Sequence, residues 1–115
     1  IDENKDKSEI KYGEGGLLDI ELAVQTALLE ERIFPRSSKT SDHFDALIKN
    51  PAQNDPKKSH KWQNLENLYW QLRFEEQILK LTTQSNLMNL QDKSSELRSH
   101  CAALLQHLDP RQRAR

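Results

Sequence analysis

The sequence predicts an all-α protein, a small antiparallel bundle of about four helices. Apolar residues recur at spacings of three and four over long segments, which is the period of an amphipathic helix. Strand signals are nearly absent, because β-branched residues are few and no Asn-Gly or Asp-Gly hairpin turn occurs. The length of 115 residues is typical of one domain, so we expect a single core. Short links between the predicted helices favour antiparallel neighbours.

The first predicted helix covers residues 17–33. It follows a cluster that holds all three glycines of the chain, Gly13, Gly15 and Gly16, and it ends before Pro35. Glycine clusters mark turns or close approaches of the backbone, and they cost conformational entropy on folding. The sequence therefore predicts a turn with a special backbone requirement directly before the first helix.

Three further helices are predicted. A short helix covers 41–49 and ends before Pro51. A long helix covers 59–84 after a loop rich in proline and asparagine, and the last helix covers 92–108 before Pro110. The long helix carries two apolar faces and is therefore expected to be central, with neighbours on two sides. Its second apolar face comprises Trp70, Phe74, Ile78 and Leu81.

Charge and composition exclude several classes of function. The formal net charge is −1, but nine acids against four bases give −5 over residues 1–34, whereas 35–60 and 61–115 each carry +2. This distribution argues against a partner made of nucleic acid. No apolar run approaches the ~18 residues of a membrane span. The single cysteine, Cys101, excludes an internal disulfide and a cysteine zinc cluster. We expect a cytoplasmic domain cut from a longer protein.

Four polar side chains stand among apolar residues on the helical wheel. Glu21 and Gln25 lie between two leucine-rich arcs of the first helix, and Glu76 falls in the main apolar stripe of the long helix. A buried carboxylate must be paired or neutralised. We therefore predict a buried polar network in which Arg73 bridges Glu21 and Glu76, with Gln25 nearby. Two roles stay open for it: fixing how two helices pack, or supporting a site at the glycine turn.

The residues alone predict no catalytic group and no metal site. Asp19 and Glu21 are two residues apart, so on a helix their carboxylates diverge by about 200° and do not form a metal-binding pair. The glycine cluster lacks the preceding strand and the following Lys-Ser/Thr of a phosphate-binding loop. No nucleophile lies in a pattern with a base. The histidines show no metal-ligand spacing: His43, His60, His100 and His107.

Two segments carry a family resemblance. KYGEGGLLDIELAVQ, at 11–25, is similar to a Lys-x-Gly-x-Gly-Gly-Leu-Arg-Asp-Ile-Glu-Phe-x-x-Gln signature, and LYWQLRFEEQILKL, at 68–81, matches a later Tyr-x-x-Leu-Arg-x-x-Glu segment. Both are typical of glutamine synthetase adenylyltransferases, and the related uridylyltransferases of nitrogen signalling have a similar glycine-rich version. The second match is carried by Tyr69, Leu72, Arg73 and Glu76. The segments stand in the family's order, and the resemblance spans about residues 11–90.

In that family the signature follows a nucleotidyltransferase core and opens a helical bundle. The resemblance therefore implies that residues 1–12 are a linker from an upstream domain, that 13–109 are the bundle and that 110–115 are an exposed tail. It also implies that the glycine cluster is a domain-junction turn. The residues of this predicted turn are Lys11, Gly13, Gly15, Gly16 and Asp19.

The chain departs from the family pattern at two positions, because Leu18 replaces the signature arginine and Glu14 replaces a frequent basic residue. The family's catalytic carboxylates, in a Gly-Ser motif followed by Asp-x-Asp, have no counterpart here. The resemblance therefore implies an accessory or regulatory domain that is inactive alone and needs no cofactor, whereas ATP and Mg²⁺ belong to the parent enzyme. The implied partners are the upstream nucleotidyltransferase domain and, for recognition, glutamine synthetase or the PII signal protein. The alternative is a stand-alone helical protein–protein interaction module without nucleotide chemistry.

Overall fold

The protein is an all-α bundle, as the sequence predicts. The computed structural model describes residues 9–50, 55–81 and 87–113, and the side chains of these except 87–92 and 113. No strand occurs among these residues. After a helical turn at 9–12, the chain forms α2 (Leu17–Glu31), α3 (Thr40–Ile48), α4 (Pro56–Leu81), α5 (Leu87–Leu108) and α6 (Pro110–Arg113).

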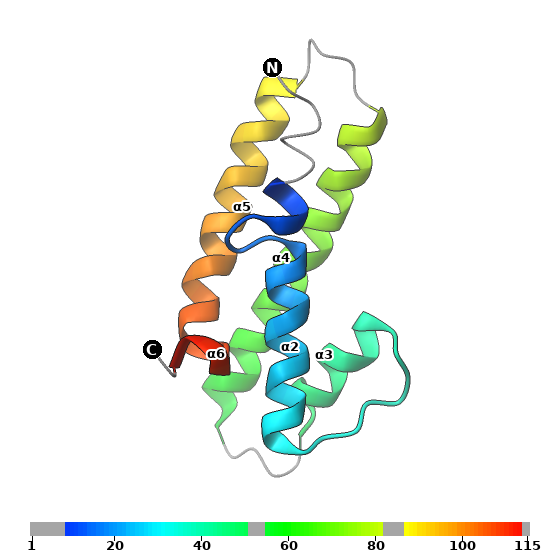
Figure 1. The fold of residues 1–115 in the computed structure, drawn as a ribbon, viewed down its shortest axis with the longest axis vertical. Coiled ribbons are helices and arrows are strands. Elements are labelled where there is room, and N and C mark those ends of the chain that lie inside the picture. The colour runs from blue at the N-terminus through cyan, green and yellow to red at the C-terminus, as the bar shows by residue number, and fades with distance from the viewer. Residues whose placement is uncertain (1–8, 51–54, 82–86, 114–115) are drawn as a thin grey trace.

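The helices are arranged around an antiparallel pair, α4 and α5 (Figure 1). α2 lies across one side of this pair, and α3 packs against both α2 and α4. The short α6 follows α5 and turns back to contact α2. The result is an elongated bundle of 49 × 30 × 20 Å in which α2 touches every other helix.

The core is built from the apolar residues that the helical period places inward. Trp62 and Phe44 are among its largest fully buried side chains, and the Phe44 and Tyr69 rings pack with centroids 5.7 Å apart. Each large apolar side chain that is fully buried contributes about 1.5–3 kcal/mol relative to exposure. The remaining buried apolar side chains include Ile10, Ile20, Val24, Leu47, Leu65, Leu72, Cys101, Leu105 and Leu108.

Local signals explain where α2 and α4 begin and end. The residue that follows α2, Arg32, caps its C-terminal end. Its backbone is left-handed (φ 56°), and its N–H donates to the carbonyl oxygens of Leu28 and Leu29. α4 begins earlier than the predicted 59, because Pro56 occupies the favoured first helical position and Asp55 Oδ1 accepts the Lys57 N–H at 3.0 Å. Asp55 and Pro56, which the sequence places in a loop, therefore cap and begin a helix.

The second apolar face of α4 is largely exposed, although the helix is central and contacts α2, α3 and α5, so the prediction is wrong in expecting a neighbour on this face. Phe74 and Leu81 are 55% and 83% exposed, and Trp70 lies at the surface with its Nε1 donating to Glu66 at 3.3 Å. The reason is geometric: α2, α3 and α5 all pack on the arc of α4 that runs from Trp62 to Leu79, so the opposite face is left to solvent.

The predicted domain boundaries also change at both ends. Within the predicted linker, residues 9–12 form a helical turn and Ile10 is buried in the core. Within the predicted exposed tail, residues 110–113 form α6, which packs on α2. The described parts of both end segments therefore belong to the bundle, whereas 1–8 and 114–115 lie outside the described residues.

Candidate functional site

The glycine cluster forms a tight turn between the helical turn at 9–12 and α2. The Gly13 N–H donates to Glu9 O at 2.8 Å, and the Gly16 N–H donates to Gly13 O at 2.9 Å. Gly15 adopts a left-handed backbone with φ 72°, and its N–H donates to Asp19 Oδ2 at 3.1 Å. Asp19 lies in the first turn of α2, where a carboxylate is also favoured by the helix dipole. It thus closes the turn from inside the helix.

The turn is made of glycine because it packs against the backbone of α5. A Cβ on Gly15 would collide with the carbonyl oxygen of Arg98 and would lie 3.0 Å from Ala102 N. A Cβ on Gly13 would lie 2.8 Å from Arg98 Nη1. The close approach that the glycines permit is therefore one between two parts of this same chain. This contact supplies an architectural reason for the cluster within the bundle itself.

Arg111 fastens the turn to the C-terminal end of the bundle. Its Nη2 donates to Asp19 Oδ1 at 2.8 Å and to Asp109 Oδ2 at 2.7 Å, and its Nε donates to Asp109 at 3.0 Å. The hydrogen bonds from Arg111 to Asp109 and Asp19 raise the pKa of the Arg111 guanidinium, against the opposing effect of burial. Asp109 is fully buried, so Arg111 is the cation that compensates its charge.

Glu21 reaches α4 through Tyr69. The Tyr69 hydroxyl donates to Glu21 Oε1 at 2.6 Å, across the α2–α4 interface. Burial, together with the hydrogen bond to Glu21 and its negative charge, raises the pKa of Tyr69 to about 12. Thr40 and Arg73 act on the same hydroxyl and lower the pKa, the first by a hydrogen bond and the second by its charge. Tyr69 is thus the residue that links Glu21 to the long helix.

The predicted buried polar network is wrong in its membership. Gln25 and Arg73 are exposed, and Glu21 and Glu76 are only half-buried. Among the described residues, the structure records no hydrogen bond or ion pair that joins two of these four side chains. Gln25 is exposed because the buried arc of α2 runs through Ile20, Val24 and Leu28 and leaves Gln25 on the opposite side of the helix.

The buried carboxylate of α4 is Glu75, one residue before the predicted Glu76. Glu75 is 5% exposed, and its Oε1 lies 3.1 Å from Lys93 Nζ on α5. Its Oε2 has no hydrogen-bond partner. The helical wheel places 72, 75 and 79 on one arc, so the sequence pattern is compatible with burial of Glu75. The same stripe also contains Glu76, which is why the sequence alone favoured Glu76 as the buried carboxylate. The interaction with Lys93 fixes the α4–α5 pair rather than a site at the glycine turn.

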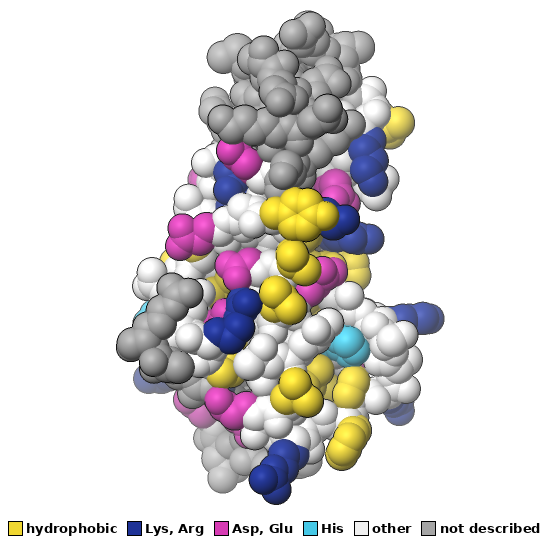
Figure 2. All heavy atoms as spheres, in the orientation of Figure 1, with side chains coloured by type: hydrophobic (Ala, Val, Ile, Leu, Met, Phe, Trp, Pro, Cys, Tyr) yellow, Lys and Arg dark blue, Asp and Glu magenta, His cyan; other side chains and the backbone are white. Residues whose placement is uncertain are grey.

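The outward side of α2 carries a row of exposed leucines. Leu18, Leu22 and Leu29 are 37%, 39% and 79% exposed, and Tyr12 precedes them at 62%. Figure 2 shows apolar side chains down the middle of this face, over the position of α2 in Figure 1. We call Tyr12, Leu18, Leu22, Gln25 and Leu29 the α2 outer face. At its upper end a hollow of about 440 Å³ is lined by Tyr12, Gly13, Glu14, Leu18, Asp19, Leu22 and Gln112.

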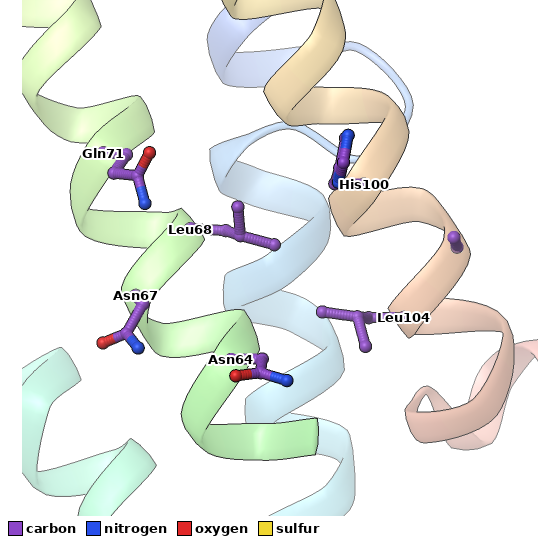
Figure 3. A pocket seen from close by; sticks show the side chains of 7 residues that line it. Asn64, Asn67, Leu68, Gln71, His100 and Leu104 are labelled. Atoms are coloured by element: carbon purple, nitrogen blue, oxygen red, sulfur yellow. The ribbon is translucent and has the colours of Figure 1, made fainter. Parts of the chain in front are cut away.

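A second concave surface lies between α4 and α5, on the side away from α2. This groove of about 500 Å³ has Leu68 and Leu104 pointing toward each other across it (Figure 3). Its polar rim contains no acidic residue, lysine or arginine and comprises Asn64, Asn67, Gln71 and His100. A further hollow of about 330 Å³ shares Leu68, Gln71 and His100, so the groove continues toward Lys93 and Glu96.

Together these features define a class of protein, a small helical bundle with exposed apolar surface. Within the part of the chain that the structure describes, no group of histidine, cysteine or carboxylate side chains could hold a metal ion. In the same residues, no helix is both long enough and apolar enough to span a membrane. Comparison with models of known protein families, with curated proteins and with solved structures gave no match.

Proposed function

We propose that this chain is a helical accessory or regulatory domain of a glutamine synthetase adenylyltransferase-like enzyme, which packs on a neighbouring nucleotidyltransferase core. The observation that carries this proposal is the α2 outer face, which begins in the same segment that resembles the family signature. A helix that is apolar on both its inner and outer sides is favoured where both sides are covered. A row of exposed apolar side chains along one helix face, here interrupted by Gln25 alone, is typical of interaction sites.

ATP and Mg²⁺ would bind to the neighbouring core and not to this chain. A metal–phosphate site needs free carboxylate oxygens, yet Asp19 is occupied by the Gly15 N–H and Arg111, and Glu21 by Tyr69. Glu14, exposed beside the turn, adds a charge that repels phosphate. The described residues at the glycine turn do not fit the nucleotide, which supports a structural or regulatory role for this chain. Glutamine synthetase and the PII protein are the proposed partners of the parent enzyme, in the cytoplasm.

The reading frame upstream of Ile1 is the first test. We expect a Gly-Ser motif followed by Asp-x-Asp directly upstream, and its absence would overturn the proposal. The second test is a titration of Mg-ATP against the isolated chain, followed by the amide shifts of Gly13, Gly15 and Gly16. We expect no residue-specific shift below about millimolar ligand, and saturable micromolar binding would contradict a non-catalytic role.

The second candidate function is a stand-alone helical interaction module. The α4–α5 groove favours this second function. It lies on the side of the bundle away from the α2 outer face, so a partner bound in it would not use the surface that the first proposal assigns to the nucleotidyltransferase core. The two candidates differ in which surface is essential. In the accessory domain, substitutions on the α2 outer face disrupt partner binding. In the stand-alone module, Leu68→Gln and Leu104→Gln in the groove do so.

A further inference from the structure

The α2 outer face has the residue spacing of a helix-packing seam. Leu18, Leu22, Gln25 and Leu29 are separated by four, three and four residues, which is the alternation of the inward positions of a coiled coil. At 1.5 Å per residue the seam extends over about 16 Å, or three helical turns. We infer that the α2 outer face binds an α-helix of the neighbouring polypeptide, and that this helix carries basic residues beside its apolar seam. The inference rests on the proposed function, because it names the element that the neighbouring domain presents.

The central position of Gln25 supports a specific helix rather than any apolar surface. Gln25 is exposed and lies between Leu22 and Leu29 in the seam. A single polar residue at an inward coiled-coil position lowers stability but specifies the register and the partner. The partner helix is therefore expected to present a polar side chain opposite Gln25 and apolar side chains opposite the leucines.

The charge around the seam is negative. α2 contains no lysine or arginine, and Asp19 and Glu21 are its carboxylates beside the seam, whereas Glu31 pairs with Lys58 at 3.8 Å. One cation lies at the Tyr12 end of the face, where Lys11 Nζ is 5.4 Å from the centroid of the Tyr12 ring. Arg111 is shared between Asp19 and Asp109, so one cation faces two carboxylates and leaves a net charge of −1. The hydrogen bond from Tyr69 leaves the charge of Glu21 in place, because the pKa of Tyr69 is raised to about 12 and the hydroxyl stays neutral at pH 7.

This charge decides between two occupants. In a coiled-coil register through the leucines, Asp19 and Glu21 occupy the positions that flank the seam, where opposite charges on the partner select pairing. A second copy of this chain would present the same acidic helix, with no lysine or arginine in α2 to pair with these carboxylates. A helix with lysine or arginine in the flanking positions would be attracted, and exposed Glu14 lies at the same end of the seam.

Two synthetic helical peptides of about three heptads test the inference. Both have leucine at the seam positions and one central asparagine, but one carries lysine and the other glutamate at the flanking positions. Binding is measured by fluorescence anisotropy at low and at high salt. Leu22→Gln removes one seam leucine without changing charge, and Leu81→Gln is the matched control, because Leu81 is an exposed leucine at the end of α4.

We expect the lysine peptide to bind at least about tenfold more tightly than the glutamate peptide at low salt, with the ratio falling as salt rises. Leu22→Gln should weaken the lysine peptide by at least about tenfold, whereas Leu81→Gln stays within about twofold. Equal binding of the two peptides, no binding, or an unaffected Leu22→Gln overturns the inference. Self-association abolished by Leu22→Gln would assign this face to a second copy and also overturn it. Binding of the nucleotidyltransferase domain itself, lost in Leu22→Gln, would leave the proposed function standing even if neither peptide binds.

Discussion

Replacing Gly15 by alanine should destabilise the bundle severely. The left-handed backbone of Gly15, with φ 72°, costs a residue with a Cβ about 1–2 kcal/mol. The new Cβ would also collide with the carbonyl oxygen of Arg98, which belongs to the α5 backbone and cannot rotate away. Overpacking at such a site costs about 1–3 kcal/mol, so the two effects together predict a loss of roughly 2–5 kcal/mol in unfolding free energy.

Urea denaturation followed by circular dichroism measures this loss, and a second variant separates its two causes. Asparagine tolerates the left-handed region but still has a Cβ, so Gly15→Asn keeps the collision and removes most of the backbone strain. If the collision with α5 dominates, Gly15→Asn and Gly15→Ala should be similarly unstable. A loss below about 0.5 kcal/mol in Gly15→Ala would place it among ordinary surface substitutions and would refute the close packing of the turn on α5.

Three further predictions concern the polar contacts of the bundle. With Tyr12→Phe in place, absorbance at 295 nm reports the ionisation of Tyr69 alone, and its midpoint should lie at about pH 12, whereas a midpoint near 10 contradicts the buried hydrogen bond. The contribution of Tyr69 to the unfolding free energy should be constant below pH 10 and decline as pH rises toward 12, because the unfolded chain releases this proton first. Glu75→Met should leave the unfolding free energy unchanged or raise it by up to about 2 kcal/mol, whereas Lys93→Met should lower it by about 1–3 kcal/mol because the buried Glu75 carboxylate loses its partner. If urea denaturation shows Glu75→Met to be less stable than Lys93→Met, this account is contradicted. Arg111→Leu should lower the unfolding free energy by about 2–3 kcal/mol, because the buried Asp109 carboxylate loses its cation. An unchanged urea midpoint would show that the contact between Arg111 and Asp109 is not formed in solution.

Helical periodicity predicted most of the fold. It placed the four main helices, and α2 begins at the predicted Leu17. Errors concentrated at the ends of the helices, and α5 begins at Leu87 rather than at the predicted 92. The Asp55 cap started α4 early, and the ordered turn after Pro110 depends on the ion pair of Arg111 with the distant Asp19. Contacts between segments so far apart leave no signal in a single helical period.

The polar groups were harder to predict than the helices. The sequence predicted Arg73 as the partner of Glu21, but in the structure its partner is the hydroxyl of Tyr69, which the sequence places in an apolar stripe. The helical period alone favours burial of Glu76, because it places this residue within the main apolar stripe of α4, whereas the structure buries Glu75 at the edge of that stripe. The two positions differ by about 100° of rotation, so the choice between them depends on which helices pack against α4.

The exposed leucines show a limit of another kind. Leu18, Leu22 and Leu29 form one of the two leucine-rich arcs that flank Glu21 and Gln25 on the helical wheel, yet the bundle leaves them at the surface. A sequence pattern records that a face is apolar, but it does not record whether the chain itself or another polypeptide covers it. The structure makes that distinction, and it is the reason that the α2 outer face, rather than the glycine turn, carries the proposed interaction.

The affinity of this chain for the nucleotidyltransferase segment that we propose lies upstream in its reading frame tests the central claim most directly. Isothermal titration calorimetry should show a one-to-one complex that Leu22→Gln weakens by at least about tenfold, while Leu81→Gln binds within about twofold of the unmodified chain. Absence of binding, or equal affinity of the two variants, would contradict the account.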